Sequence, residues 1–138
     1  MTINAIINDL IKNLDRRQKD VIEARFGLLR GTKQTLAAIG RKYNLTRERI
    51  RQIEAASLNI VRKKFDDLPA KKISEAAFGE LKKFGGVRKE DDFIKDLIIL
   101  LKDNNINGRD LKFIFEVARK PEFYRGDNNY YDFWYLDK

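Results

Sequence analysis

Apolar residues recur every three or four positions along most of this chain, which is the spacing of amphipathic helices. The first such stretch is Thr2 to Asn13, with apolar positions at Ile3, Ile6, Ile7, Leu10, Ile11 and Leu14. The same spacing predicts further helices over residues 16–26, 35–43, 46–64, 73–84, 90–102 and 109–119. The pattern therefore predicts a mainly α-helical protein.

Residues that begin or end helices support these limits. Residues of the N-cap type stand at or near the predicted starts: Asp15, Thr35, Thr46, Ser74 and Asn107. Gly27 and the pair Gly85–Gly86 are stop signals, because glycine readily adopts the left-handed conformation that ends many helices. Pro69 disfavours helical backbone at Leu68 and so marks a boundary. We expect two small domains, residues 1–68 and residues 69–138.

The last segment changes from helical spacing to aromatic-rich stretches around a turn. Residues 122–125 and 130–136 flank a Gly-Asp-Asn-Asn sequence that is typical of β-hairpins. Alternation along the last strand gives two faces, one with Tyr131, Phe133 and Tyr135 and the other with Tyr130, Trp134 and Leu136. These aromatic residues could stack on single-stranded nucleic acid, but an isolated hairpin is barely stable in water. We therefore expect core packing, with Trp134 buried against the helices.

The composition excludes several classes of function. Since the 138 residues include no Cys and no His, the chain has no disulfide, no Cys/His metal site and no histidine-based catalysis. The acidic pairs Asp66–Asp67 and Asp91–Asp92 are neighbours in sequence, which do not face each other on a helix. We expect a non-enzymatic protein without a cofactor. No apolar run approaches the length of a membrane span and no signal peptide is recognisable, so we expect a soluble, intracellular protein.

Basic residues are concentrated in the first half of the chain. The net charge is +8, and residues 1–72 hold 17 Lys and Arg against 8 Asp and Glu, while residues 73–138 hold 12 against 13. A charge of +9 on one half and −1 on the other is typical of a protein with one nucleic-acid-binding half. The alternative is a solvated basic surface without a partner.

A helix-turn-helix motif in the basic half favours nucleic-acid binding over a solvated surface without a partner. The short predicted helix 35–43 is followed by the turn Tyr43-Asn44-Leu45 and by the longer helix that Thr46 begins. Asn44 stands where the turn needs a positive φ, which asparagine tolerates better than other residues with a side chain. Leu45 is expected to fill the angle between the two helices.

The second helix of this motif carries side chains that can read bases. Ile50, Ile53 and Ser57 form its buried side. Near its N-terminus, away from the buried side, stand the candidate base-reading residues Arg47, Glu48, Arg51 and Gln52. Arg can donate two hydrogen bonds to guanine, Gln can pair with adenine and Glu can accept from cytosine. A recognition helix presents its N-terminal residues to the major groove, so position and chemistry agree.

Three strings carry a resemblance to a known family: Arg25-Phe26-Gly27-Leu28, Thr35-Leu36-Ala37-Ala38-Ile39-Gly40, and Leu45 to Ala55. From about Leu14 to Lys64 the chain resembles region 4 of bacterial sigma factors of the primary type. The resemblance implies a domain that reads the −35 promoter element as double-stranded DNA through Arg47, Glu48, Arg51 and Gln52. It implies phosphate contacts at Arg17, Arg25, Thr35, Leu36 and Arg49. It also implies docking on the flap of the RNA polymerase β subunit. One departure is Ala56, where the family usually has Lys.

The second half has a weaker resemblance. Helices followed by a two-stranded hairpin suggest a small winged-helix-like α+β domain. The hairpin is similar to that of the HARE-type winged helix of the RNA polymerase delta subunit, where a Phe-Tyr strand and a Trp-containing strand flank a short wing. Because this half is nearly neutral, we do not expect a second major DNA surface on it. A protein contact is at least as well supported.

Two functional hypotheses follow. The first is a cytoplasmic, nucleoid-associated bacterial protein that reads a −35-type element and docks on RNA polymerase. The second is a non-enzymatic adaptor that binds polymerase through one or both domains with little DNA specificity. No stretch of the sequence could open a promoter, so the chain is either part of a longer sigma factor or a specialised protein. The helix at Thr2 to Asn13 is correspondingly either a lid on the core or the tail of a linker, and we favour the lid.

Overall fold

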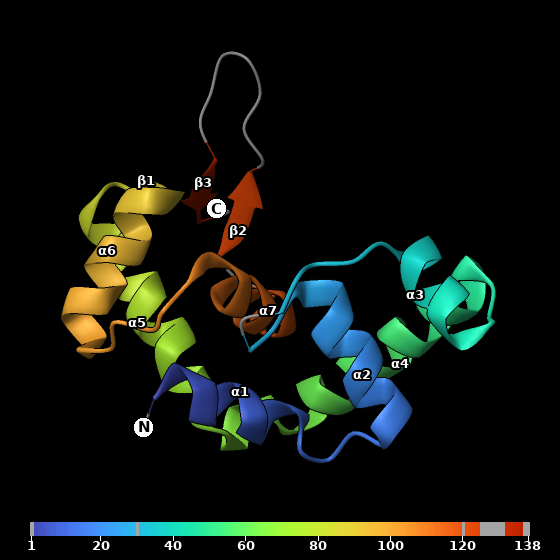
Figure 1. Cartoon of the computed structure of the whole chain (residues 1–138). Coiled ribbons are helices and arrows are strands. Elements are labelled where there is room, and N and C mark those ends of the chain that lie inside the picture. Colours follow the sequence, from blue (N-terminus) through green and yellow to red (C-terminus); the bar gives the residue numbers. More distant parts are fainter. Residues whose placement is uncertain (1, 30, 120, 125–131, 137–138) are drawn as a thin grey trace.

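The computed structural model describes residues 2–29, 31–119, 121–124 and 132–136. The first part of the chain forms α1 (Ile3–Ile11), α2 (Arg16–Phe26), α3 (Leu36–Tyr43) and α4 (Arg47–Lys64). A short 3-10 helix, η1 (Phe65–Asp67), leads into α5 (Ala70–Lys83), β1 (Val87–Lys89), α6 (Glu90–Leu101), α7 (Gly108–Ala118), β2 (Glu122–Tyr124) and β3 (Phe133–Tyr135). Figure 1 shows α3 and the start of α4 at one end, α5 and α6 at the other, and α7 between them. None of the described helices is long and apolar enough to cross a membrane.

The predicted helix starts are confirmed at four of the five capping residues. The side chains of Asp15, Thr35, Thr46 and Asn107 each accept a hydrogen bond from a backbone N–H in the first turn of the helix that follows. Ser74 is the exception, and its prediction as a cap is wrong. Helix α5 already begins at Ala70, directly after Pro69, and Ser74 is buried inside it. Proline favours a helix start because its fixed φ suits the first turn and its missing N–H is not needed there.

The second half has the order helix, strand, helix, helix, strand, strand, which is that of a winged helix. The predicted hairpin is present as antiparallel β2 and β3, with Phe123 opposite Trp134. The sequence did not predict β1, which pairs with the other edge of β3 and places Arg88 opposite Trp134. This strand has three residues, two of them basic, and follows Gly85–Gly86, so no alternating pattern marked it. The Gly-Asp-Asn-Asn turn, Tyr130 and Tyr131 lie outside the described residues.

The inner face of the hairpin is part of the core, as predicted. The side chain of Trp134 is 2% exposed, and its ring meets that of Phe115 edge-on at a centroid distance of 4.9 Å. Leu136, on the same face, packs against the core. On the other face the rings of Phe133 and Tyr135 lie 5.8 Å apart and are partly exposed. The face with Trp134 therefore supplies the apolar contacts that hold the small sheet on the helices.

Two clusters of buried apolar residues hold the protein together. The smaller one lies within the helix-turn-helix and consists of Val21, Ile39, Ile50 and Ile53, with Ala24, Leu36, Tyr43 and Leu45 packed around it. The larger one joins α1, the C-terminal part of α4, α5, α6, α7 and Trp134. Helix α1 therefore covers a core that it shares with α5 and α7. The expected boundary near residue 68 divides the sequence, but the larger cluster extends across it.

Truncating the single tryptophan tests the role of the hairpin in this core. Removing a buried Trp side chain typically costs about 3–5 kcal/mol, so Trp134→Ala should lower the free energy of unfolding by that amount. Val87→Ala, in the same sheet, is the control, because Val87 is 51% exposed and should change stability by less than about 1 kcal/mol. Urea denaturation followed by far-UV circular dichroism measures both. Equal shifts of the two midpoints would contradict burial of the indole.

Candidate nucleic-acid interface

The turn between α3 and α4 is built on a close backbone approach. Asn44 has φ 56°, as the sequence predicted, and the Leu45 N–H donates to the Gly40 carbonyl at 2.8 Å. A Cβ atom on Gly40 would lie 2.6 Å from the Leu45 carbonyl oxygen. No real side chain tolerates that distance, so α3 can meet the start of α4 only with glycine at this position. Leu45 packs into the smaller cluster and fills the angle between the helices, as expected.

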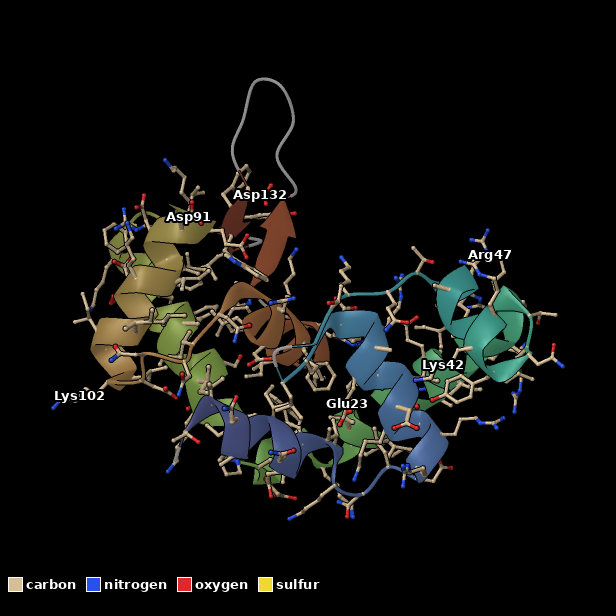
Figure 2. All side chains as sticks on the ribbon, viewed as in Figure 1. Glu23, Lys42, Arg47, Asp91, Lys102 and Asp132 are labelled. Atoms are coloured by element: carbon tan, nitrogen blue, oxygen red, sulfur yellow. The ribbon has the colours of Figure 1, made fainter. Side chains whose placement is uncertain are left out.

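The recognition helix α4 presents its four candidate base-reading residues on one exposed surface. Its N-terminus is fixed by Thr46, whose hydroxyl oxygen accepts from the Arg49 N–H at 3.1 Å. Its other side is buried through Ile50, Ile53 and Ser57, as the spacing predicted. The structure thus brings together four exposed side chains: Arg47, Glu48, Arg51 and Gln52. Figure 2 shows Arg47 at the outer edge of the molecule, beyond α3.

Two hydrogen-bonded pairs organise this exposed surface. Arg51 donates from two nitrogens to the Glu48 carboxylate, at 2.9 and 2.6 Å. This hydrogen bond lowers the pKa of Glu48 and raises the pKa of Arg51. Arg49 donates to the Gln52 side-chain oxygen at 3.4 Å. Because both members of the ion pair are more than half exposed, water screens it, and opening it costs little free energy.

The residues expected to contact phosphate surround the start of α3 and the recognition helix. Thr35 caps α3, and its hydroxyl oxygen accepts from the Ala38 N–H at 3.1 Å. Leu36 is the first residue of α3 and is partly buried, so its backbone N–H is the group that can meet a phosphate at this helix N-terminus. The Arg17 guanidinium lies 5.2 Å from the centre of the Tyr43 ring. Arg49 is exposed beside the candidate base-reading residues.

Arg25 has a structural contact that the sequence did not reveal. Its Nε lies 3.4 Å from the Glu54 carboxylate, and its Nη1 donates to the Gln34 carbonyl at 3.3 Å. The side chain, 31% exposed, therefore links α2 to α4 and to the segment before α3. Its contact with phosphate stays a prediction. Ala56, the departure from the family pattern, lies on the exposed side of α4.

Sequence reasoning missed a cleft that lies where the two halves of the chain meet. The cleft has a volume of about 760 Å³ and is lined by six basic residues and two acidic ones. We call it the basic cleft, and its charged residues are Arg25, Lys33, Arg62, Arg109, Lys112, Arg119, Glu54 and Glu116. The charged residues at positions 109, 112, 116 and 119 recur at helical spacing. That spacing was the only feature of the sequence that could have indicated a charged face on this helix.

Comparison with known proteins locates the family resemblance. Residues 10–63 match the family described as Sigma-70, region 4. The chain is 46% identical over 56 residues to RNA polymerase sigma factor SigA4 of Synechococcus elongatus, covering 41% of this chain and 18% of that protein. It is 48% identical over 62 residues to SigA of a Nostoc species, covering 43% and 16%. It is 38% identical over 61 residues to RpoD of Neisseria gonorrhoeae, and the match covers 44% of this chain and 10% of that protein. The chain thus spans less than a fifth of the length of these relatives.

Replacing Gly40 tests the close approach that the turn depends on. Gly40→Ala forces a Cβ against the Leu45 carbonyl and should lower the free energy of unfolding by about 1–3 kcal/mol. Gly79→Ala is a matched control within α5, because a Cβ at Gly79 meets nothing within 4 Å. It should raise stability by about 0.5–1 kcal/mol, since alanine loses less entropy than glycine in a helix. If urea denaturation showed that both substitutions raise stability, the close approach of Gly40 to the Leu45 carbonyl would be contradicted.

Proposed function

From the Sigma-70 region 4 helix-turn-helix domain that residues 10–63 form, we propose that this protein binds promoter DNA as part of transcription initiation. In this proposal α4 enters the major groove and reads a −35-type element. The observation that carries it is the exposed group Arg47, Glu48, Arg51 and Gln52 at the capped N-terminus of α4. The proposed role is one of binding and positioning and involves no catalysis.

The four side chains suit direct readout because together they can recognise three different bases. Arg47 and Arg51 can each donate two hydrogen bonds to guanine, Gln52 can pair with adenine, and Glu48 can accept from the amino group of cytosine. The Glu48–Arg51 pair keeps both groups at the surface in the free protein. On binding, the two side chains either open toward separate bases or enter the groove together.

Contacts with phosphate would fix the position of α4 in the groove. The start of α3 offers backbone N–H groups at Leu36 and the hydroxyl of Thr35, beside the path of one strand. Arg17, Arg25 and Arg49 are proposed to contact phosphates on either side. Such contacts determine register and affinity but do not distinguish sequences.

Binding to RNA polymerase is the second part of the proposal. The relatives are RNA polymerase sigma factors. As the resemblance to region 4 implies, we propose that the matched segment docks on the flap of the β subunit. A polymerase adaptor with little DNA specificity is the alternative function, and one observation favours it. Ile99 and Leu100, near the end of α6, are 76% and 45% exposed, which is unusual for adjacent large apolar residues and suits a protein contact.

Single alanine variants test base readout. Arg51→Ala and Gln52→Ala should each weaken binding to a −35-type duplex by about 1–3 kcal/mol, or about 5- to 150-fold, because a base contact is lost. Binding to a scrambled duplex should change much less. Lys95→Ala, on the exposed side of α6, is the control and should change neither affinity. Fluorescence anisotropy titrations at one fixed salt concentration supply the constants.

The same titrations separate the two functions. Equal losses on the two duplexes would contradict the assignment of Arg51 and Gln52 to base readout. If the unaltered protein binds both duplexes equally but still binds purified RNA polymerase core enzyme, the adaptor is the better description.

A further inference from the structure

The segment between α2 and α3 has to be held in place by other parts of the protein. None of its described residues, 27–29 and 31–34, belongs to a helix or a strand. It ends at Thr35 and Leu36, where the start of α3 is proposed to contact phosphate. Figure 1 shows the segment running from the side of α7 to the start of α3. Whatever fixes this segment therefore also fixes the place where α3 begins.

Helix α2 holds the end of the segment that lies next to α3. The Gln34 N–H donates to the Ala24 carbonyl at 2.8 Å, and Arg25 donates from Nη1 to the Gln34 carbonyl at 3.3 Å. Both backbone groups of Gln34 are therefore tied to the last turn of α2. The Gln34 N–H also reports on the segment, because a hydrogen-bonded amide exchanges with water only when the structure around it opens.

Helix α7 holds the rest of the segment through Arg109. The Nη1 of this residue donates to the Gly31 carbonyl at 2.6 Å. The stem of the same side chain passes close to Gly27, where a Cβ atom would lie 3.1 Å from the Arg109 Cδ and 2.8 Å from the Lys33 backbone nitrogen. One arginine of the second half thus contacts the segment at two points.

The conformation of Leu29 also depends on these surroundings. Leu29 has φ 55°, a left-handed conformation that residues with a side chain rarely adopt. Its side chain packs against the larger cluster, and its backbone N–H lies near the carboxylate of Asp110, which is 1% exposed. Burial raises the pKa of Asp110, while the Asn107 side chain and the Leu29 N–H oppose that rise. Strained backbone persists only where its surroundings hold it, and α7 supplies part of them here.

Helix α7 can support the segment because it is itself fixed to α2 and α4. In its middle, the ring of Phe113 lies 5.1 Å from the ring of Phe26. At its end, Arg62 of α4 donates to the backbone carbonyls of Glu116 at 2.9 Å and of Val117 at 3.4 Å. These carbonyls belong to the last turn of α7, where a helix leaves such groups without partners of its own. The support and the helices that it serves therefore form one connected unit.

We propose that Arg109 is a positioning residue for DNA binding, which sets the start of α3 through the segment that it holds and does not itself contact DNA. This inference rests on the proposed function. It gives the winged-helix-like half a role in promoter binding that requires no DNA surface on that half. Loosening the segment lowers the fraction of molecules that are ready to bind, and the apparent affinity falls by the same factor.

The test is Arg109→Met in the whole chain, because methionine keeps an unbranched stem but donates no hydrogen bond. Losing one hydrogen bond should reduce the fraction ready to bind by about twofold to tenfold. Affinities for a −35-type duplex and for a scrambled one should both fall by that factor, since phosphate contacts do not distinguish sequences. The slope of log K against log salt should stay the same, because the bound protein makes the same phosphate contacts. Fluorescence anisotropy titrations at several salt concentrations measure all three quantities.

Two further variants and one measurement on the free protein complete the test. Arg109→Lys keeps a positive charge and a donor on an unbranched stem, so it should recover part of the lost affinity. Lys95→Met removes the same charge from an exposed position on α6 and should change neither affinity. Thermal melts establish that every variant is folded at the temperature of the titrations. By NMR, the Gln34 N–H should exchange about twofold to tenfold faster in Arg109→Met than in the unaltered protein.

The outcomes separate this inference from the proposed function. If Arg109→Met lowers the salt slope by about 0.9 and leaves the exchange of Gln34 unchanged, Arg109 contacts phosphate directly and the positioning role is wrong. If the unaltered protein prefers the −35-type duplex and Arg109→Met keeps both affinities, the positioning role is wrong and the proposed function stands. If the unaltered protein binds both duplexes equally, base readout is wrong, and the affinities still decide the role of Arg109. If it binds neither duplex, the proposed function is wrong and this inference falls with it.

Discussion

The packing of α7 is the interaction on which the rest of the structure depends. Its apolar side chains contact α1, α2, α4 and α5, and its aromatic residues meet Phe26 on one side and Trp134 on the other. Without α7, Trp134 of the hairpin would lose its contact with Phe115, and α1 would lose one of the helices on which it packs. The two halves that the sequence suggests are therefore joined by a helix that belongs to the core of both.

The helix-turn-helix could be predicted in detail because its signals are local. Thr35, Asn44 and Thr46 fix the ends of their helices through hydrogen bonds and backbone angles that depend on neighbouring residues. The positions of the four candidate base-reading residues follow from the spacing of the buried residues along one helix. Local signals gave a wrong prediction at Ser74. This residue is of the capping type but lies inside a helix that already begins after Pro69.

Features that depend on distant parts of the chain were not predictable from the pattern. Strand β1 exists because β3, more than forty residues later, offers it a free edge, and nothing in Val87-Arg88-Lys89 indicates that pairing. The basic cleft likewise arises only when the segment after α2 meets α7. Arg25 was assigned from family resemblance alone, and its link to Glu54 depends on how α2 crosses α4. Tertiary contacts of this kind leave no periodic trace in a single sequence.

The turn at Gly40 also affects how mutational data on this protein would be interpreted. A side chain at Gly40 would press against the Leu45 carbonyl oxygen, so almost any substitution strains the turn that positions α4. If α4 reads DNA as proposed, a deep mutational scan scored by promoter occupancy would rank Gly40 beside Arg51 as an intolerant site. One of the residues scored as essential for that proposed recognition would then have no side chain with which to reach a base.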